Sequence, residues 1–99
     1  MRRVIFSRTA ERRLENLLEY LVENWSDKVK NDFLNKLDQA ISIIKVHPES
    51  FPASQKEIGL RKCVVTKQTT VYFLFDKKEV KILTLFDSRQ DPVKLRNEL

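Results

Sequence analysis

Basic side chains in the C-terminal half of this chain have the clearest capacity for chemistry. Three of them lie close together in the sequence with no acidic residue between them, and a fourth belongs to the polar stretch DSRQDP at 87–92. Guanidinium and ammonium groups donate several hydrogen bonds and hold phosphate or carboxylate groups well. We therefore expect these residues, with one neighbouring aspartate, to bind a phosphate group or a partner molecule. The candidate binding residues are Arg61, Lys62, Lys67, Arg89 and Asp91.

Catalysis on a phosphate ester would need more than these cations. A general base must remove a proton, a general acid must protonate the leaving oxygen, and cations must stabilise the developing charge. Arg61 and Arg89 suit the last role, and Tyr72 could stack on a nucleic-acid base. An acid–base pair is harder to find, because the single histidine, His47, stands at a predicted helix end where it typically contacts helix carbonyls. Arg61, Arg89 and Tyr72 remain catalytic candidates without a firm assignment.

The same residues also have purely structural interpretations. Arg61 could bridge to Asp91 or to a helix end. Arg89 could brace its own turn through Asp87 or Asp91. The pair Asp91-Pro92 is a common way to begin a turn, and a tyrosine in a strand often only packs in or beside the core. Residue types alone leave both interpretations open.

The elements that must position these residues begin with two helices. One apolar stripe with helical spacing predicts a helix over 8–24, with Ser7 or Thr9 as its N-cap. A second stripe predicts a helix over 27–46, with Ser26 as its N-cap. The break between them is short, so we expect an antiparallel helix hairpin. The stripes are Leu14, Leu17, Leu18, Leu21 and Trp25, then Val29, Phe33, Leu37, Ala40, Ile41 and Ile44.

Four strands are predicted, at 2–6, 60–66, 70–76 and 79–86, the last three joined by short turns. The predicted order is β-α-α-β-β-β, an α+β two-layer fold with the helix hairpin on a mainly antiparallel four-stranded sheet. We expect a single domain over residues 1–99, since this length suits one core.

Two expectations about the site follow from this sheet. The strands 60–66 and 79–86 flank the strand 70–76, so we expect Arg61 and Arg89 to lie near each other. Simple alternation would place Val80, Ile82, Thr84 and Phe86 on one face of the last strand. The face away from the helices should be partly apolar and partly basic, with Tyr72 or Phe73 available on it.

Composition narrows the classes of function. The net charge of +5 favours an acidic partner, either nucleic acid or an acidic protein segment. The single cysteine, Cys63, rules out an internal disulfide and a cysteine-based zinc cluster, and we expect it to be buried. No metal or other cofactor is expected. No apolar run approaches the ~20 residues of a membrane span, and the N-terminal apolar stretch is too short for a secretory signal, so we expect a cytoplasmic protein.

The C-terminal half, GLRKCVVTKQTTVYFLFDKKEVKILTLFDSRQDPVKL at 59–95, resembles the RelE/ParE superfamily of bacterial toxins. The resemblance rests on order and spacing, and FSRTAERRLENLLEYL also resembles the first helix of that superfamily. The matching motifs are Gly59-Leu60-Arg61, Tyr72-Phe73, Asp76 and Arg89-Gln90-Asp91-Pro92.

The resemblance implies the toxin of a type II toxin–antitoxin module, held inactive by a cognate antitoxin that covers the sheet face or the helix hairpin. RelE-type members cut messenger RNA on the ribosome, and ParE-type members poison DNA gyrase without cutting RNA. This chain has no arginine in the strand 70–76, and its tail PVKLRNEL has no tyrosine or histidine. Both features favour the ParE-like branch, in which the toxin is not an enzyme. The alternatives are a ribosome-dependent endoribonuclease and a non-toxic module that binds only antitoxin or nucleic acid, and a homodimer or a toxin–antitoxin hetero-oligomer is possible.

Overall fold

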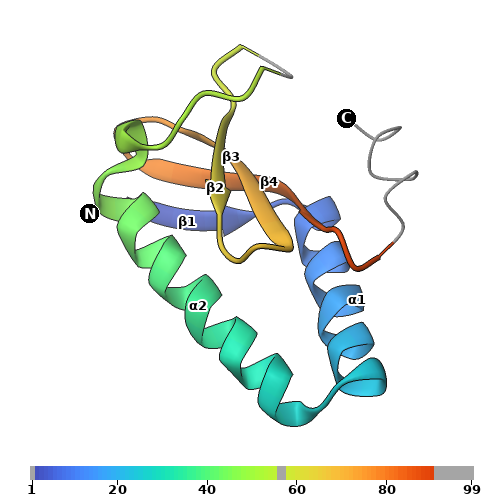
Figure 1. The fold of residues 1–99 in the computed structure, drawn as a ribbon. Coiled ribbons are helices and arrows are strands. Elements are labelled where there is room, and N and C mark those ends of the chain that lie inside the picture. The colour runs from blue at the N-terminus through green and yellow to red at the C-terminus, as the bar shows by residue number, and fades with distance from the viewer. Residues whose placement is uncertain (1, 56–57, 91–99) are drawn as a thin grey trace.

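The computed structural model describes residues 2–55 and 58–90. The predicted order β-α-α-β-β-β is confirmed, and both helices begin and end where the apolar stripes predicted (Figure 1). Asp91 and Pro92, which the sequence singled out, lie outside the described residues. The elements are β1 (Arg3–Phe6), α1 (Arg8–Asn24), α2 (Asp27–Val46), the 3-10 helix η1 (Pro48–Ser50), β2 (Arg61–Val64), β3 (Thr69–Phe75) and β4 (Glu79–Asp87).

Serine side chains cap both long helices. The backbone N–H of Ala10 donates to Ser7 Oγ at 3.0 Å, and that of Val29 donates to Ser26 Oγ at 3.1 Å. Each bond satisfies one of the N–H groups that a helix start leaves without a partner. Ser7 Oγ also donates to the carbonyl of Leu83 at 2.6 Å. The residue that starts α1 therefore also fixes α1 against the middle of β4.

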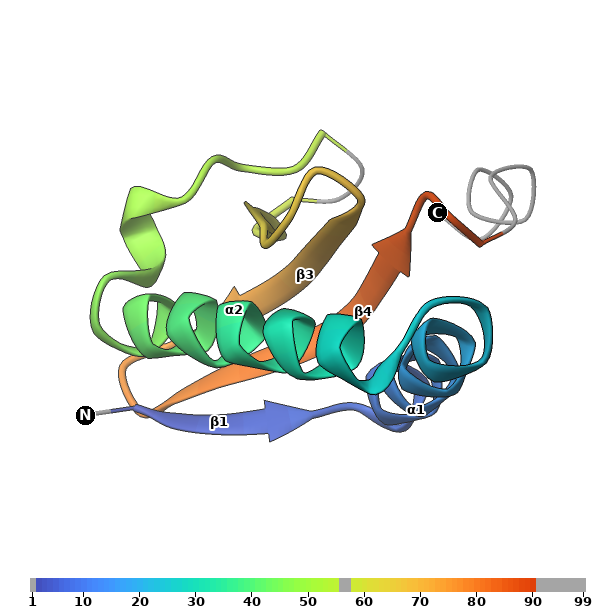
Figure 2. The same cartoon turned by 60° about the horizontal axis from the view of Figure 1, so that its bottom comes forward.

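The sheet has the strand order β1-β4-β3-β2. β1 runs parallel to β4, and the other two pairs are antiparallel. β1 pairs with the stretch Glu79–Ile82, and within residues 2–55 and 58–90 no strand borders the second half of β4 on that side. α1 lies beyond the end of β1, and α2 crosses one face of the sheet (Figure 2). The end of β4 is thus bordered by α1 on one side and by β3 on the other.

A β-bulge interrupts the alternation of β4. Tyr72 pairs with Thr84, whereas the next residue of β3, Phe73, pairs with Ile82, so Leu83 is an extra residue. The face toward the helices therefore passes from Ile82 to Leu85. The expectation that Thr84 and Phe86 share a face with Val80 and Ile82 is wrong, because the bulge moves them to the other face. Asp87 moves with Leu85 to the helix side and is fully buried.

The core fills the space between the helix hairpin and the sheet. Each helix contributes one apolar face, and no helix of the described part of the chain is long and apolar enough to cross a membrane. Cys63 belongs to this core, as expected. The main buried residues are Ala10, Leu17 and Leu21 of α1, Phe33, Leu37 and Ile44 of α2, and Val71, Phe73, Val80, Ile82 and Leu85 of the sheet.

Replacing Phe73 by alanine should destabilise the protein strongly. Its side chain is fully buried and meets Phe51 edge to face, with ring centroids 5.8 Å apart. The cavity and the lost burial should cost about 3–5 kcal/mol. Val64→Ala is the matched control in the same sheet, since Val64 is 66% exposed and should cost less than about 0.5 kcal/mol. Urea unfolding measures both, and equal losses would contradict this position of the core.

Candidate functional site

Arg61 lies at the start of β2 and its guanidinium is held by the chain itself. Nη1 donates to the carbonyl of Phe51 at 2.6 Å and to that of Glu49 at 3.3 Å. The guanidinium also lies over the Phe75 ring, 5.5 Å from its centroid. These contacts fasten the segment after η1 to the sheet. They agree with the interpretation in which Arg61 binds a helix end.

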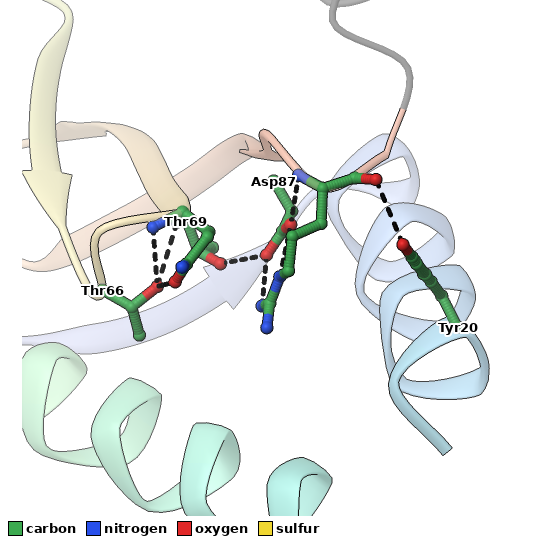
Figure 3. A network of polar contacts seen from close by, with 6 residues as sticks. Tyr20, Thr66, Thr69 and Asp87 are labelled. Atoms are coloured by element: carbon green, nitrogen blue, oxygen red, sulfur yellow. Dashed lines mark hydrogen bonds and ion pairs between the residues drawn. The ribbon is translucent and has the colours of Figure 1, made fainter. Parts of the chain in front are cut away.

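Arg89 is held by Asp87 in a two-pronged ion pair (Figure 3). Arg89 Nε donates to Asp87 Oδ1 at 2.9 Å, and Nη2 donates to Oδ2 at 2.6 Å. The backbone N–H of Arg89 adds a third bond to Oδ1 at 2.9 Å, and Thr69 Oγ1 donates to Oδ2 at 2.5 Å. Tyr20 of α1 donates from its hydroxyl to the carbonyl of Arg89 at 3.2 Å. The structural interpretation of Arg89, in which it braces its own turn through Asp87, is thus confirmed.

Asp87 stays charged although it is buried. Burial alone raises the pKa of a carboxyl group, but the hydrogen bonds from Arg89 and Thr69 outweigh that effect, and the pKa of Asp87 lies below its ordinary value. The same pair raises the pKa of Arg89, through the hydrogen bond to Asp87. Since the Arg89 side chain is only 20% exposed, little water screens the pair. We call Asp87, Arg89 and Thr69 the Asp87 network.

Arg61 and Arg89 do not lie near each other, so that expectation is wrong. Arg61 pairs with Phe73, whereas Asp87 pairs with Thr69 at the other end of β3. β2 and β4 are both antiparallel to β3 and therefore run in the same direction as each other. The first residue of β2 and the residues after β4 must then lie at opposite ends of the sheet.

The sheet face away from the helices carries its own row of side chains, which we call the open face. Lys62, Tyr72 and Thr84 pair directly across three neighbouring strands, so their side chains share this face. Tyr72 meets Phe86 edge to face at 5.9 Å between ring centroids. Lys62 is exposed and Tyr72 is partly exposed. Phe73, the alternative aromatic residue that the sequence offered for this face, is buried on the helix side instead.

Arg13 of α1 completes the open face and was not among the residues selected from the sequence. Its Nη1 donates to Thr84 Oγ1 at 2.7 Å, and its guanidinium lies 4.4 Å from the centroid of the Phe86 ring. Burial lowers the pKa of Arg13, with Arg12 as a lesser cause. A signal was present: Arg13 stands three residues after Ala10 and four before Leu17, both fully buried, so it belongs to the buried side of its helix.

The other candidates lie apart from these two groups. Lys67 is exposed in the turn between β2 and β3. Burial raises the pKa of the Cys63 thiol, which favours the unreactive protonated form. His47 ends α2, where its backbone N–H donates to the carbonyl of Ile43 at 2.8 Å. Within residues 2–55 and 58–90, no three His, Cys, Asp or Glu side chains are grouped so that they could hold a metal ion.

Several solved structures share this fold with the chain, and two of them come from toxin–antitoxin systems. The chromosomal ParDE system of P. aeruginosa aligns with a TM-score of 0.73 at 15% identity, covering 88% of this chain and 96% of that one. The toxin–antitoxin complex DinJ-YafQ of E. coli aligns with a TM-score of 0.60 at 13% identity, covering 89% and 93%. The conserved hypothetical protein HP0894 of Helicobacter pylori aligns with a TM-score of 0.59 at 17% identity, covering 90% and 97%. At these identities the likeness concerns the fold.

The family is set by a sequence match. Residues 4–92 match the model of the ParE toxin of the type II toxin–antitoxin system parDE. The chain belongs to the ParE toxin family, and it is a type II toxin. The resemblance to the RelE/ParE superfamily is thereby confirmed. A comparison with curated protein sequences gives no match.

Removing the counter-ion of Asp87 should be costly. Arg89→Met leaves a buried carboxylate without its partner, and we expect a loss of about 3 kcal/mol at pH 7. The lowered pKa of Asp87 means that its stabilising effect is present above the unfolded pKa of about 3.9 and is lost as pH falls through the folded pKa. The gap between wild type and Arg89→Met should therefore shrink below about pH 4.

Guanidinium unfolding at pH 7 and at pH 3 measures this gap. Arg3→Met is the matched control, because the ion pair of Arg3 with Glu79 is exposed and should contribute less than about 1 kcal/mol. A gap for Arg89→Met that stays the same at both pH values would contradict the role given to the charge of Asp87.

Proposed function

We propose that this toxin inhibits growth by binding an essential protein, DNA gyrase, and does not cleave RNA. The observation that carries the proposal is that Arg61 and Arg89, the two arginines selected from the sequence as phosphate ligands, are already engaged by other groups of the protein. Arg61 donates to two backbone carbonyls, and Arg89 donates both prongs of its guanidinium to Asp87. Each would have to give up strong hydrogen bonds to grip a substrate phosphate. Membership of the ParE family supports the same choice.

The open face is the surface that we assign to the target. Lys62 and Tyr72 stand side by side on neighbouring strands, and Arg13 and Phe86 lie against the same row. Tyr72 and Arg13 are partly exposed, whereas Phe86 is buried and supports them. Aromatic and arginine side chains on a rigid support are the residues that most often dominate protein interfaces. Lys67, exposed in the next turn, extends the positive charge toward the end of the sheet. In this proposal Arg89 and Asp87 shape the end of β4 and do not contact the target themselves.

A cognate antitoxin is the second proposed partner. Two of the solved structures with this fold are toxin–antitoxin assemblies, and the family model describes the toxin of such a system. We place the toxin, its antitoxin and gyrase in the cytoplasm. The positive net charge of the chain would favour acidic stretches in both partners.

An endoribonuclease remains the second candidate because of one feature of the open face. Tyr72 could stack on a base while the exposed Lys62 beside it neutralises a phosphate, which is a common way to bind single-stranded RNA. Among the described residues of the open face, no carboxylate or imidazole lies beside Tyr72 to act as a general base or a general acid. We therefore rank this function below target binding.

Controlled expression in a bacterial host tests the proposal with two readouts from one culture. We expect a DNA-damage response while messenger RNA, mapped by primer extension, stays intact. Cuts within translated messages would overturn the proposal in favour of the ribonuclease. A harmless product would favour the non-toxic module.

Variants of the open face test the assignment of the surface. Tyr72→Ala and Lys62→Glu should raise the toxin concentration that half-inhibits purified gyrase by about 10-fold or more, the size expected for anchor residues. Lys77→Glu is the matched control, since Lys77 is exposed in the turn between β3 and β4 and lies outside the row. Thermal unfolding checks that each variant is folded. Unchanged inhibition by both open-face variants would refute the assignment.

A further inference from the structure

A small pocket of about 140 Å³ lies between α2 and the turn that joins β2 to β3. Its apolar wall is formed by Val29 and Phe33 of α2. Its polar side includes Lys36 of the same helix, Gln68 of the turn and Arg89 after the end of β4. None of these residues belongs to the open face, so this pocket, which we call the α2 pocket, is a separate site.

The turn that forms one wall of the α2 pocket is held firmly. Thr66 Oγ1 accepts the backbone N–H groups of Gln68 at 3.1 Å and Thr69 at 3.0 Å, and the carbonyl of Gln68 accepts the N–H of Ser88 at 2.8 Å. Thr69 in turn is bound to Asp87 (Figure 3). Thr66 Oγ1 donates to Gln68 Oε1 at 3.4 Å, which leaves the amide N–H groups of Gln68 for a ligand.

The charges around the α2 pocket leave one cation uncompensated. The Asp32 carboxylate pairs with Lys28 at 3.0 Å, and the Asp87 carboxylate pairs with Arg89. Asp32 stands four residues before Lys36, which is a favourable spacing for an ion pair, yet it pairs with Lys28 instead. The Lys36 ammonium has no ion pair or hydrogen bond with any residue that the structure describes. The pocket therefore carries one positive charge that a ligand could balance.

The size and the lining of the pocket limit the class of ligand. A water molecule takes about 30 Å³ of liquid, so about 140 Å³ holds roughly four or five groups of that size. A carboxylate with two or three carbon atoms has this size, and its single negative charge matches the single free cation. A phosphate ester carries about −1.5 to −2 at pH 7 and would place its charge against the apolar wall. The pocket thus suits a carboxylate better than a phosphate.

We propose that the α2 pocket binds a carboxylate carried on a short apolar stem. The ammonium of Lys36 and the amide of Gln68 donate to the carboxylate, and the apolar wall receives the stem. Arg89 only bounds the pocket, because Asp87 holds both prongs of its guanidinium and balances its charge. The ligand is either a free aliphatic acid or the glutamate side chain of a partner protein. This site does not rest on the proposed function.

A bound carboxylate would join two elements that are otherwise linked only by packing at this place. Among the described residues, no hydrogen bond or ion pair connects α2 with the turn at Thr66–Gln68. A ligand that binds only the folded protein stabilises it according to its concentration. We expect Tm to rise by about 5–8 °C at ten times the Kd of the ligand.

Titration with butyrate, followed by NMR at constant ionic strength, tests the chemistry of the pocket. We expect saturable binding in about the millimolar range, with the largest shifts at Lys36 and Gln68. Butyramide has the same shape without the charge and should bind at least 10-fold more weakly. Inorganic phosphate should also bind more weakly than butyrate. Equal binding of butyrate and butyramide, or tighter binding of phosphate, would overturn the proposal.

Variants of the two donors test the assignment of the pocket. Lys36→Met keeps the stem of the side chain and removes its charge, so affinity for butyrate should fall at least 10-fold. Gln68→Leu removes one neutral donor and should lower the affinity by about 3- to 10-fold. Lys77→Met is the matched control, because it removes the same charge from the turn between β3 and β4 and should leave the affinity unchanged. Thermal unfolding confirms that each variant is folded, and full affinity in both pocket variants would refute the site.

A pair of short peptides identifies the source of the carboxylate. Both have blocked ends and consist of alanine around one central residue, which is glutamate in one and glutamine in the other. Tighter binding of the glutamate peptide than of butyrate would identify a side chain of a partner protein as the ligand. Tighter binding of butyrate would identify a free acid. In either case Lys36→Met should weaken binding at least 10-fold, and glutamate and glutamine peptides that bind equally well, together with no butyrate binding, would exclude a carboxylate site.

Discussion

The ion pair of the buried Asp87 carboxylate with Arg89 is the interaction on which the end of β4 depends. A charge with no exposed surface needs several donors, and Asp87 receives four hydrogen bonds, from the side chains of Arg89 and Thr69 and from the backbone of Arg89. These donors join the end of β4 to the start of β3. Tyr20 then ties α1 to the same turn through the carbonyl of Arg89. One charge thus fixes where three elements meet.

The bulge in β4 is what makes this arrangement possible. Without the extra residue at Leu83, alternation would place Asp87 on the open face and Phe86 in the core. With it, Phe86 and Thr84 reach the open face, where Arg13 and Tyr72 contact them. The bulge therefore positions both the Asp87 network at the end of β4 and the Tyr72–Phe86 aromatic pair on the open face. Bulges commonly re-aim side chains next to functional surfaces in this way.

The sequence predicted the elements well and the site poorly, for a physical reason. Helix bounds depend on local signals such as the caps Ser7 and Ser26, and these were readable. The separation of Arg61 and Arg89 was also readable, because in three strands joined by short turns the first and the third run in the same direction, so the start of one and the end of the other lie at opposite ends of the sheet. The orientation of Asp87 was not readable, because it depends on one extra residue in β4 and such a bulge has no local signature in the chain. Arg13 was readable in principle, because a basic residue on the buried side of an amphipathic helix needs an explanation.

The net charge of the chain is a poor guide to its partners, because acidic and basic side chains lie on different surfaces of the protein. The chain carries +5 overall, yet α1 has an exposed row of glutamates at every fourth position, while the open face presents Lys62 and Arg13. The row consists of Glu11, Glu15, Glu19 and Glu23. Attraction between partners acts over about 10 Å at ordinary salt, so each surface selects its partner by its own charge. The glutamate row therefore favours a basic segment of a partner, whereas the open face favours an acidic one, and the net charge alone predicts neither preference by place.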